Sequence, residues 1–224
     1  MARPGTRRQA RGVFLTLEGP EGSGKSTQIA FLGAALRKAG YPVVYTREPG
    51  GTKLAEIIRG TLLSASSAEP IAPETEAFLV LAARSQHVTH LIRPALARGS
   101  IVLCDRFADS TFAYQGFGRR LSLSWLQTAN HAATRGLLPH FTLLLDVPVS
   151  VGLARRRQAS GKLNRLDRES QQFHMRVRKG FLTLASRTPR RIKVINANRP
   201  AHVVRAEIEA VVLGWLGKRR RRGG

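Results

Sequence analysis

The strongest constraint on this 224-residue chain is a glycine-rich segment, GPEGSGKST, which runs from Gly19 to Thr27 and fits the pattern G-x-x-x-x-G-K-[ST]. A β-branched and apolar run at residues 13–17 precedes it, and apolar residues recur at helical spacing over residues 25–38. Such a turn between a strand and a helix directs backbone N–H groups at a phosphate, to which the helix N-terminus adds its positive dipole. The segment therefore predicts a nucleotide-phosphate site.

Each residue of this loop has an expected part in binding the phosphates of ATP. The glycines let the backbone curve around a phosphate, Lys25 neutralises phosphate charge, and the Ser26 hydroxyl ligates Mg²⁺. Mg²⁺ bound together with ATP is therefore the expected cofactor. The predicted ATP-binding residues are Gly19, Pro20, Glu21, Gly22, Ser23, Gly24, Lys25, Ser26 and Thr27.

Strand-like and helical segments alternate along the rest of the chain. The strand-like runs are residues 13–17, 43–46, 101–104, 141–145 and 192–195. The helical segments are residues 25–38, 54–63, 74–97, 121–135, most of 150–187, and 201–216. Short apolar strands separated by helices favour a parallel sheet covered on both faces. We therefore predict an α/β fold with a five-stranded parallel sheet and helices on both faces.

Composition excludes several classes of protein. Hydrophobic residues make up 42% of the chain in short runs, which argues against both a disordered and a membrane-spanning protein. The lone cysteine, Cys104, excludes an internal disulfide and suits a reducing cytoplasm. We expect one domain at residues 13–216, between a disordered basic extension at 1–12, which lacks the apolar core of a secretory signal, and a basic tail at 217–224.

The net charge of +23 has two explanations, of which nucleic-acid binding is the more obvious. Four arginines in residues 1–12 and five basic residues in 217–224 account for nine of these charges, but neither segment contains an aromatic residue. Recognition of single-stranded nucleic acid needs aromatic residues for stacking, so we expect only weak, salt-sensitive binding by these tails. Arginines elsewhere suit phosphate groups, or simply serve as surface cations.

A second candidate site follows the strand-like run 101–104. Asp105 and Arg106 would lie at the carboxyl edge of the sheet beside the glycine-rich loop, where open α/β sheets bind ligands. Asp105 would hold magnesium through water, and Arg106 would reach a phosphate. A structural ion pair is the alternative. Cys104 is expected to act as a small buried hydrophobic residue.

A series of motifs, in the same order, resembles the thymidylate (dTMP) kinases, and more particularly their bacterial form. After the glycine-rich loop come TREPGG at 46–51, AAR at 82–84, DRF at 105–107, AYQG at 113–116, GR at 118–119, LDV at 145–147, NR at 164–165, FHMRVR at 173–178 and GFL at 180–182. The resemblance implies a P-loop kinase fold with a short arginine-rich lid, a homodimer, and transfer of the γ-phosphoryl group of ATP to dTMP. Another nucleoside monophosphate as acceptor is the alternative.

The same resemblance assigns the acceptor site. Arg59 and Arg106 would hold the acceptor phosphate, with Glu48 near it and its magnesium. Arg84 and Gln115 would hydrogen-bond the thymine edge, and Tyr114 would pack on the deoxyribose. From the residues alone, Arg59 and Arg84 fit solvated helix positions, and Tyr114 and Gln115 fit loop positions. The dTMP-binding residues so implied are Glu48, Arg59, Val80, Arg84, Arg106, Thr111, Tyr114 and Gln115.

The family that this chain resembles has two forms, which differ in the position of the arginine that assists phosphoryl transfer. One form has this arginine inside the loop, where this chain has Gly22, so the lid at about residues 150–167 is expected to supply it here. The candidates are Arg155, Arg157 and Arg165, of which Arg165 matches the family motif best. Arg156 and Arg168 fit a solvated helix face. With Lys25, Asp105 and Arg106, these three candidates complete the predicted catalytic set.

Three positions depart from the family pattern. Val80 stands where a phenylalanine usually stacks on thymine, so we expect either weaker dTMP binding or replacement of that ring by Phe78 or Phe112. Asn164 replaces an aspartate before the lid arginine. Phe107 replaces a tyrosine and is expected to have a packing role.

Overall fold

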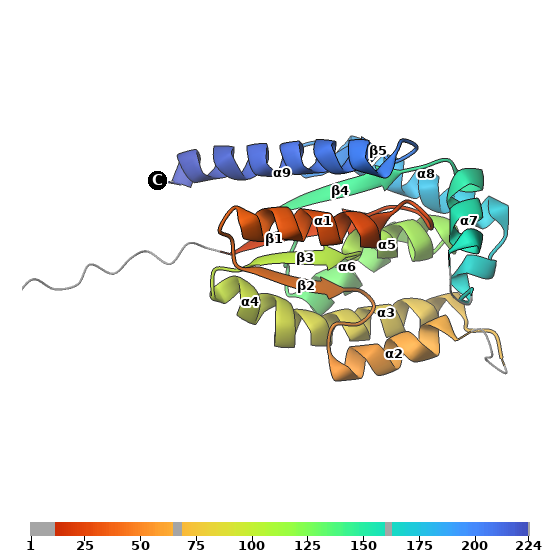
Figure 1. The fold of residues 1–224 in the computed structure, drawn as a ribbon. Helices are drawn as coiled ribbons and strands as arrows, with labels where there is room; N and C mark the ends of the chain where they lie inside the picture. Colours follow the sequence, from red (N-terminus) through yellow and green to blue (C-terminus); the bar gives the residue numbers. More distant parts are fainter. Residues whose placement is uncertain (1–11, 65–68, 160–162, 224) are drawn as a thin grey trace, which may run out of the picture.

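Five parallel strands form a central sheet in the computed structural model of the chain, which describes residues 12–64, 69–159 and 163–223 (Figure 1). The strands are β1 (Val13–Glu18), β2 (Val43–Arg47), β3 (Ile101–Asp105), β4 (Phe141–Asp146) and β5 (Ile192–Asn196). Their order is β2-β3-β1-β4-β5, and every adjacent pair is parallel. The central strand, β1, is buried along its whole length. The predicted sheet is confirmed.

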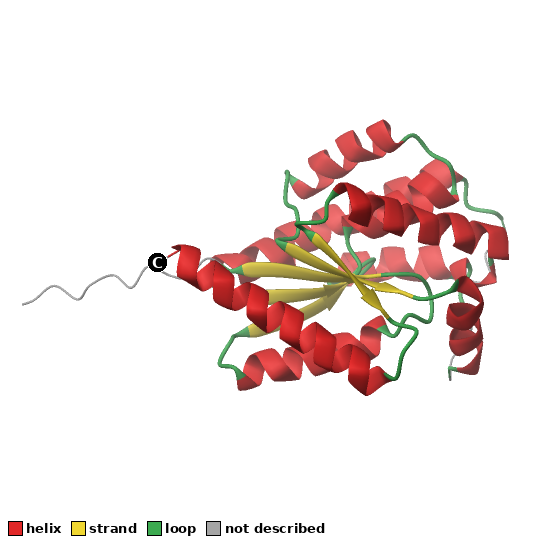
Figure 2. Ribbon diagram, turned by 90° about the horizontal axis from the view of Figure 1, so that it is seen from above, coloured by secondary structure: helices red, strands yellow, loops and turns green. Residues whose placement is uncertain are grey.

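Helices cover both faces of this sheet (Figure 2). They are α1 (Lys25–Lys38), α2 (Lys53–Leu63), α3 (Pro73–His87), the π-helix η1 (Val88–Ile92), α4 (Arg93–Ala97), α5 (Ala108–Thr111), the π-helix η2 (Phe112–Gly118), α6 (Leu123–Thr134), α7 (Val149–Gln158), the 3₁₀ turn η3 (Leu166–Arg168), α8 (Gln171–Arg187) and α9 (Ala201–Gly223).

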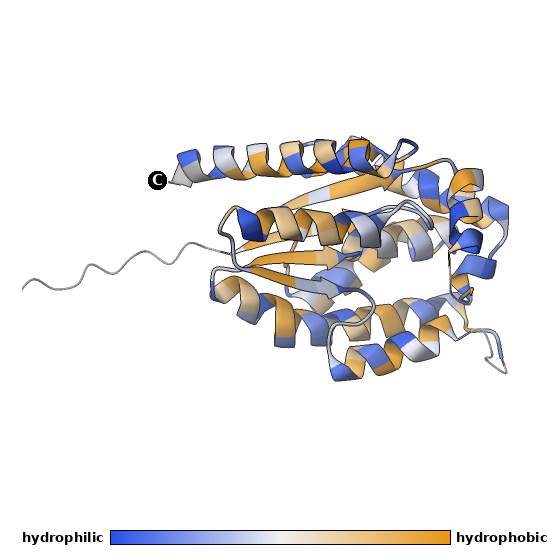
Figure 3. Ribbon diagram, viewed as in Figure 1, coloured by the Kyte–Doolittle hydropathy of each residue, from blue (hydrophilic) through white to orange (hydrophobic). Residues whose placement is uncertain are grey.

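Side chains of β1 alternate between two cores, as they must on a pleated strand. Leu15 and Leu17 pack with α1 and α9 on one face, whereas Phe14 packs with η1 and α4 on the other. Cys104 belongs to this second core and is buried, as expected. Apolar residues concentrate on the strands, as Figure 3 shows. The sheet is therefore apolar on both faces, which leaves its carboxyl edge as the place for polar chemistry.

One helical segment was not foreseen. The glycine-rich segment that contains Tyr114 and Gln115 is not a loop, because α5 and η2 make residues 108–118 helical. The glycines here serve close packing of helices. A Cβ atom on Gly118 would lie 2.7 Å from the ring of Phe173 in α8, and one on Gly180 of α8 would lie 2.8 Å from the ring of Phe117. The contact between η2 and α8 therefore overrides the low helix propensity of glycine.

The last helix is longer than predicted. α9 continues to Gly223, so residues 217–223 extend a helix rather than form a separate tail. The predicted extension at the N-terminus lies, except for Gly12, outside the described residues. Among the helices that the structure describes, none is both long and apolar enough to cross a bilayer.

Candidate active site

The glycine-rich loop joins β1 to α1 at the carboxyl edge of the sheet. Gly19, Gly22 and Gly24 all have positive φ, of 144°, 66° and 87°, which side-chain-bearing residues rarely adopt. A Cβ atom on Gly19 would also lie 2.3 Å from the carbonyl oxygen of Leu145. These glycines therefore have the structural role expected of a phosphate-binding loop.

Lys25 is held inside this loop. Its Nζ atom donates to the carbonyl oxygens of Gly19 at 3.0 Å and Pro20 at 2.8 Å, and to Ser23 Oγ at 3.2 Å. Burial, helped by the nearby charge of Arg106, lowers the pKa of Lys25 to about 8. The ammonium group is thus largely desolvated and lies where the loop would hold a phosphate.

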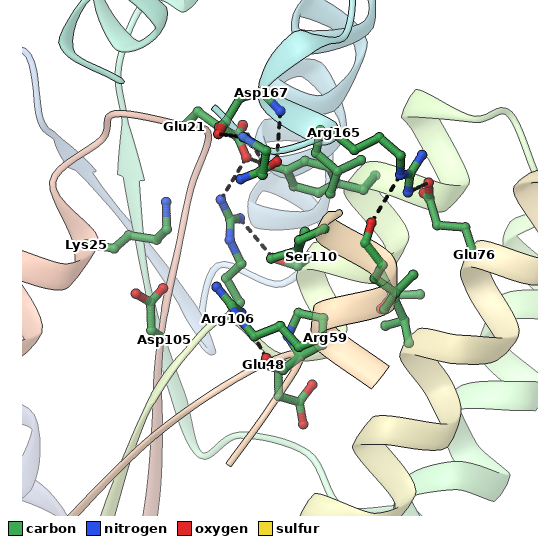
Figure 4. A pocket seen from close by; sticks show the side chains of 18 of the residues that line it. Glu21, Lys25, Glu48, Arg59, Glu76, Asp105, Arg106, Ser110, Arg165 and Asp167 are labelled. Atoms are coloured by element: carbon green, nitrogen blue, oxygen red, sulfur yellow. Dashed lines mark hydrogen bonds and ion pairs between the residues drawn. The ribbon is translucent and has the colours of Figure 1, made fainter. Parts of the chain in front are cut away.

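A cavity of about 300 Å³ opens beside this lysine (Figure 4). Its walls come from the glycine-rich loop, α2, α3, the end of β3, α5, η2 and the segment around η3. One face of α3 contributes Glu76, Val80 and Arg84, which follow one another at the four-residue spacing of a helix face. The lining includes Lys25, Ser26 and Asp105 and every predicted acceptor residue: Glu48, Arg59, Val80, Arg84, Arg106, Thr111, Tyr114 and Gln115.

Ser26 and Asp105 meet at the end of the cavity next to the loop. The Ser26 hydroxyl donates to Asp105 Oδ2 at 3.1 Å, and Asp105 Oδ1 is buried without a hydrogen-bond partner in the described parts of the chain. No group of three His, Cys, Asp or Glu side chains among the described residues could hold a metal by itself. The Ser26 hydroxyl oxygen and the unpartnered Asp105 Oδ1 suit an Mg²⁺ ion that keeps waters and phosphate oxygens as its other ligands.

Arg106 connects the loop to η2. Its φ of 70° is unusual for a residue with a side chain, and its guanidinium donates to the Gly19 carbonyl oxygen at 2.9 Å and to Glu21 Oε1 at 3.1 Å. The Tyr114 hydroxyl donates to the same carboxylate at 2.5 and 2.6 Å. Burial opposes ionisation of Glu21, yet Arg106, His174 and Lys25 outweigh it and lower its pKa to about 2. Glu21 is therefore an anion that orients both Arg106 and Tyr114.

Arg84 and Glu48 form a buried ion pair on the opposite wall. Arg84 is 1% exposed, and its Nε donates to Glu48 Oε2 at 2.7 Å. Its Nη1 donates to Thr111 Oγ1 and to Asn130 Oδ1, both at 2.9 Å. His87, to which the sequence assigned no role, bonds Glu48 Oε1 at 2.9 Å through Nδ1. The sequence held one signal for this contact, because His87 follows Arg84 by three residues and so lies on the same face of the helix.

The lid arginines are arranged differently from the prediction. Arg156, predicted to be on a solvated face, lines the cavity and pairs with Asp167 at 2.8 Å. Arg155 and Arg157 do not line it, and Arg155 Nη1 instead donates to the carbonyl oxygen of Ala197 at 2.9 Å. Successive residues of a helix point about 100° apart, so only one of three adjacent arginines in α7 faces the cavity.

Arg165, the preferred candidate, does line the cavity. Its Nη2 donates to Glu76 Oε2 at 2.5 Å and its Nε to the carbonyl oxygen of Leu62 at 3.0 Å, so it is held by α3 and α2 rather than by the loop. The turn that carries it is closed by Asn164 and Asp167, whose side chains each accept a backbone N–H of the other residue. Asn164 thus caps this turn in place of an aspartate.

The predicted replacements for a stacking phenylalanine are wrong. Phe78 is 58% exposed and lies edge-on to Trp125, with ring centroids 5.4 Å apart, and Phe112 packs against the core under α4. Neither lines the cavity. Phe107 is fully buried against Phe14, which confirms its packing role. Neither phenylalanine therefore supplies the aromatic ring that Val80 lacks.

The helix α7 touches the loop at two glycines. A Cβ atom on Gly22 would lie 1.9 Å from the carbonyl oxygen of Gly152, and one on Gly152 would lie 2.4 Å from the carbonyl oxygen of Glu21. These backbone contacts exclude any side chain at position 22. An arginine needed beside the loop has to come from another part of the chain.

Glu18 gives the structure a predictable pH dependence. It is fully buried, accepts from Ser110 Oγ at 2.6 Å and from the Phe107 N–H at 2.7 Å, and its pKa is raised to about 7 by burial and then by Asp109. The folded chain therefore binds more protons than the unfolded chain between about pH 4.5 and pH 7, so stability falls as pH rises through that window.

We expect Glu18→Gln to remove this dependence, which amounts to roughly 3 kcal/mol over the window. Thermal unfolding at pH 5, 6, 7 and 8 measures it, with Glu74→Gln on the exposed side of α3 as the matched control. Equal pH dependence of the two variants would contradict the assignment.

Comparisons with known proteins agree with this geometry. The sequence model of the family described as thymidylate kinase matches residues 17–208. The chain is 53% identical over 208 residues to a thymidylate kinase of Thermomicrobium roseum, covering 93% of this chain and 98% of that one. It is 51% identical to that of Pseudomonas putida (strain GB-1), covering 91% and 96%. A crystal structure of thymidylate kinase from Ehrlichia chaffeensis matches with a TM-score of 0.73 and 33% identity, covering 90% of this chain and 98% of that one.

Proposed function

Because the chain belongs to the thymidylate kinase family, we propose that the cavity at the carboxyl edge of its sheet is where it transfers the γ-phosphoryl group of ATP to dTMP, giving ADP and dTDP. One observation carries the proposal. Lys25 of the glycine-rich loop and all eight residues of the predicted acceptor set line a single cavity, although they lie on separate segments between residues 25 and 115. A donor and an acceptor bound there would place their phosphates together.

The cavity has two ends of different chemistry. At the loop end, Lys25, Arg106 and Arg59 offer three cations to the phosphates of the two substrates, whose mutual repulsion they offset. At the other end, Arg84, Thr111 and Gln115 are buried polar groups suited to the edge of a base. Tyr114, fixed by Glu21 between the two ends, would pack on the deoxyribose and leave no room for a 2′-hydroxyl.

Mg²⁺ would be held by Ser26 and, through water, by Asp105, and would supply charge neutralisation at the transferred phosphoryl group. The chain's own part in the reaction is to align the two phosphates, exclude water and stabilise charge. Arg106 would bind the acceptor phosphate while it holds the loop through Gly19, so that acceptor and donor are positioned by one side chain. Arg156 and Arg165 are the arginines of the predicted lid that line the cavity, and they would reach a nucleotide bound in it.

The acceptor is tested by measuring ADP release with ATP and Mg²⁺ against dTMP, dUMP, ribothymidine monophosphate, dCMP and dGMP. We expect dTMP to be turned over best of the five, and much faster than ribothymidine monophosphate, which carries the same base. Equal turnover of dGMP, or turnover of another acceptor only, would leave the phosphate site in place and remove the thymidylate assignment from this cavity.

Restoring an aromatic ring at position 80 should strengthen dTMP binding. Val80 lies one helical turn before Arg84 and lines the cavity, and base–aromatic stacking contributes roughly 1–3 kcal/mol per base. We expect Val80→Phe to lower the Kd of dTMP by roughly 5-fold to 160-fold in a calorimetric titration. Phe78→Leu, which changes a ring outside the cavity, should leave that Kd unchanged. A higher Kd for Val80→Phe would show that thymine does not lie over this residue.

The homodimer is part of the same proposal. Large apolar side chains are exposed on adjacent helices: Leu54 and Ile57 on α2, at 50% and 68%, and Phe78 on α3, beside Trp125 of α6. Leu81 and Ile92, by contrast, are buried in the protomer. The molar mass in solution from light scattering tests this assembly. A lone buried thiol and ATP-dependent chemistry support a cytoplasmic location.

A further inference from the structure

Glu76 is a buried carboxylate at the end of the cavity away from the loop. It is 1% exposed and has four hydrogen bonds. Oε1 accepts from Gln115 Nε2 at 2.7 Å and from Arg119 Nε at 3.3 Å, and Oε2 accepts from Arg119 Nη2 at 3.0 Å and from Arg165 Nη2 at 2.5 Å. Figure 4 shows Glu76 and Arg165 side by side. Although burial alone would raise the pKa of Glu76, the bonds from Arg119, Gln115 and Arg165 lower it.

An ionised Glu76 decides how the amide of Gln115 is turned. An ionised carboxylate only accepts hydrogen bonds, so the NH₂ end of the amide must face it. The amide oxygen of Gln115 then points away from Glu76, and no donor within the described ranges is bonded to it. Gln115 is 3% exposed and lines the cavity. Glu76 thus takes one N–H of the Gln115 amide, and the amide oxygen is the acceptor that the protein offers on the side facing away from Glu76.

We propose that Glu76 is a specificity-determining positioning residue: it fixes the Gln115 amide so that the acceptor site takes a base with an N–H donor at this edge, as thymine and uracil have at N3, and rejects cytosine. This inference rests on the proposed function, because it assumes that the base of the acceptor nucleotide reaches Gln115. Cytosine carries an unprotonated ring nitrogen at N3. This nitrogen and the Gln115 amide oxygen, both acceptors, would then face each other, and each would lose the hydrogen bonds that it made to water before binding. A site built around one hydrogen bond discriminates strongly against the analogue that cannot make it.

The test compares ratios of kcat/KM in Glu76→Gln. A glutamine at position 76 can offer either end of its amide, so Gln115 is free to turn its NH₂ toward N3 of cytosine. We expect the dTMP/dCMP ratio to fall at least 10-fold, while the dTMP/dUMP ratio stays within about 3-fold of its original value, because thymine and uracil share the same N3–H. A structural defect alone would lower all three activities together and leave both ratios unchanged, which would overturn the proposal.

Arg119→Ala is the matched control. It removes two bonds to Glu76 but leaves the carboxylate facing Gln115 and paired with Arg165. We expect it to lower the activities on dTMP and dCMP alike, with the dTMP/dCMP ratio held within about 3-fold.

Gln115→Leu shows whether Glu76 acts through Gln115. With no amide left to orient, Glu76→Gln should change the dTMP/dCMP ratio no further in the Gln115→Leu background, whereas an equal change in both backgrounds would overturn the proposal. If Glu76→Gln does not fold, Gln115→Leu alone still decides, since unchanged discrimination in that variant excludes an oriented amide as its cause. A wild-type enzyme without activity on dTMP would instead refute the proposed function, and this inference with it.

Discussion

Lys25→Ala is expected to lower kcat/KM for phosphoryl transfer to dTMP by roughly 10³-fold or more, because it removes a preorganised cation from a desolvated site next to the transferred group. The Nζ atom lies inside the loop and donates to Gly19, Pro20 and Ser23, so a bound phosphate would take the place of one of these three partners. The fold should not suffer. Burial of this ammonium lowers its pKa and so costs stability at neutral pH, and we expect the Tm of the variant to be equal or higher.

Lys38→Ala, at the exposed end of the same helix, is the control for Lys25→Ala and should retain full activity. A second readout is independent of turnover. With a pKa of about 8 in the free protein, Lys25 is partly neutral near pH 8.5, and bound phosphate raises that pKa again. ATP binding should then take up protons in calorimetry with buffers of different ionisation enthalpy, and Lys25→Ala should abolish the uptake. Uptake that persists in the variant would assign the proton to another group.

Arg84→Ala is expected to cost about 3–5 kcal/mol of stability as well as dTMP binding. Glu48 would remain buried with only His87 as its partner, and Thr111 and Asn130 would each lose a donor. For a chain of this length, the loss corresponds to a fall in Tm on the order of 10 °C. Thermal unfolding without ligand measures it, and dTMP titration of the folded fraction measures the binding.

The cause of that destabilisation can be separated from the loss of volume. Arg84→Met fills most of the space and still leaves the buried Glu48 carboxylate with His87 alone, so its Tm should remain low. Adding Glu48→Gln removes the charge, and we expect the double variant to regain stability relative to Arg84→Met alone. A Tm for Arg84→Ala within 2 °C of the wild type would show that the ion pair contributes little.

The elements that the sequence predicts well are those with strong local signals. The five strands, the glycine-rich loop and the helix after it depend on apolar patterning and on glycines at fixed spacing, and the structure has them within one or two residues of the predicted bounds. Asp105 and Arg106 were placed by the same reasoning, because a strand end in a parallel sheet has a known position.

The remaining features depend on contacts between distant segments. Residues 108–118 are helical because Gly118 and Gly180 allow η2 and α8 to pack closely. Local helix propensities do not include such a contact. The direction of Arg156 depends on how α7 lies on the loop. Glu76, which no motif singled out, acquires its place only when α3, η2 and the turn at Arg165 come together.

The close contact between Gly22 and Gly152 has an evolutionary consequence. A single substitution at position 22 cannot move an arginine into the loop, because α7 occupies that space with its backbone. A side chain at position 22 would require α7 to move away from the loop, so this position and the packing of a whole helix have to change together.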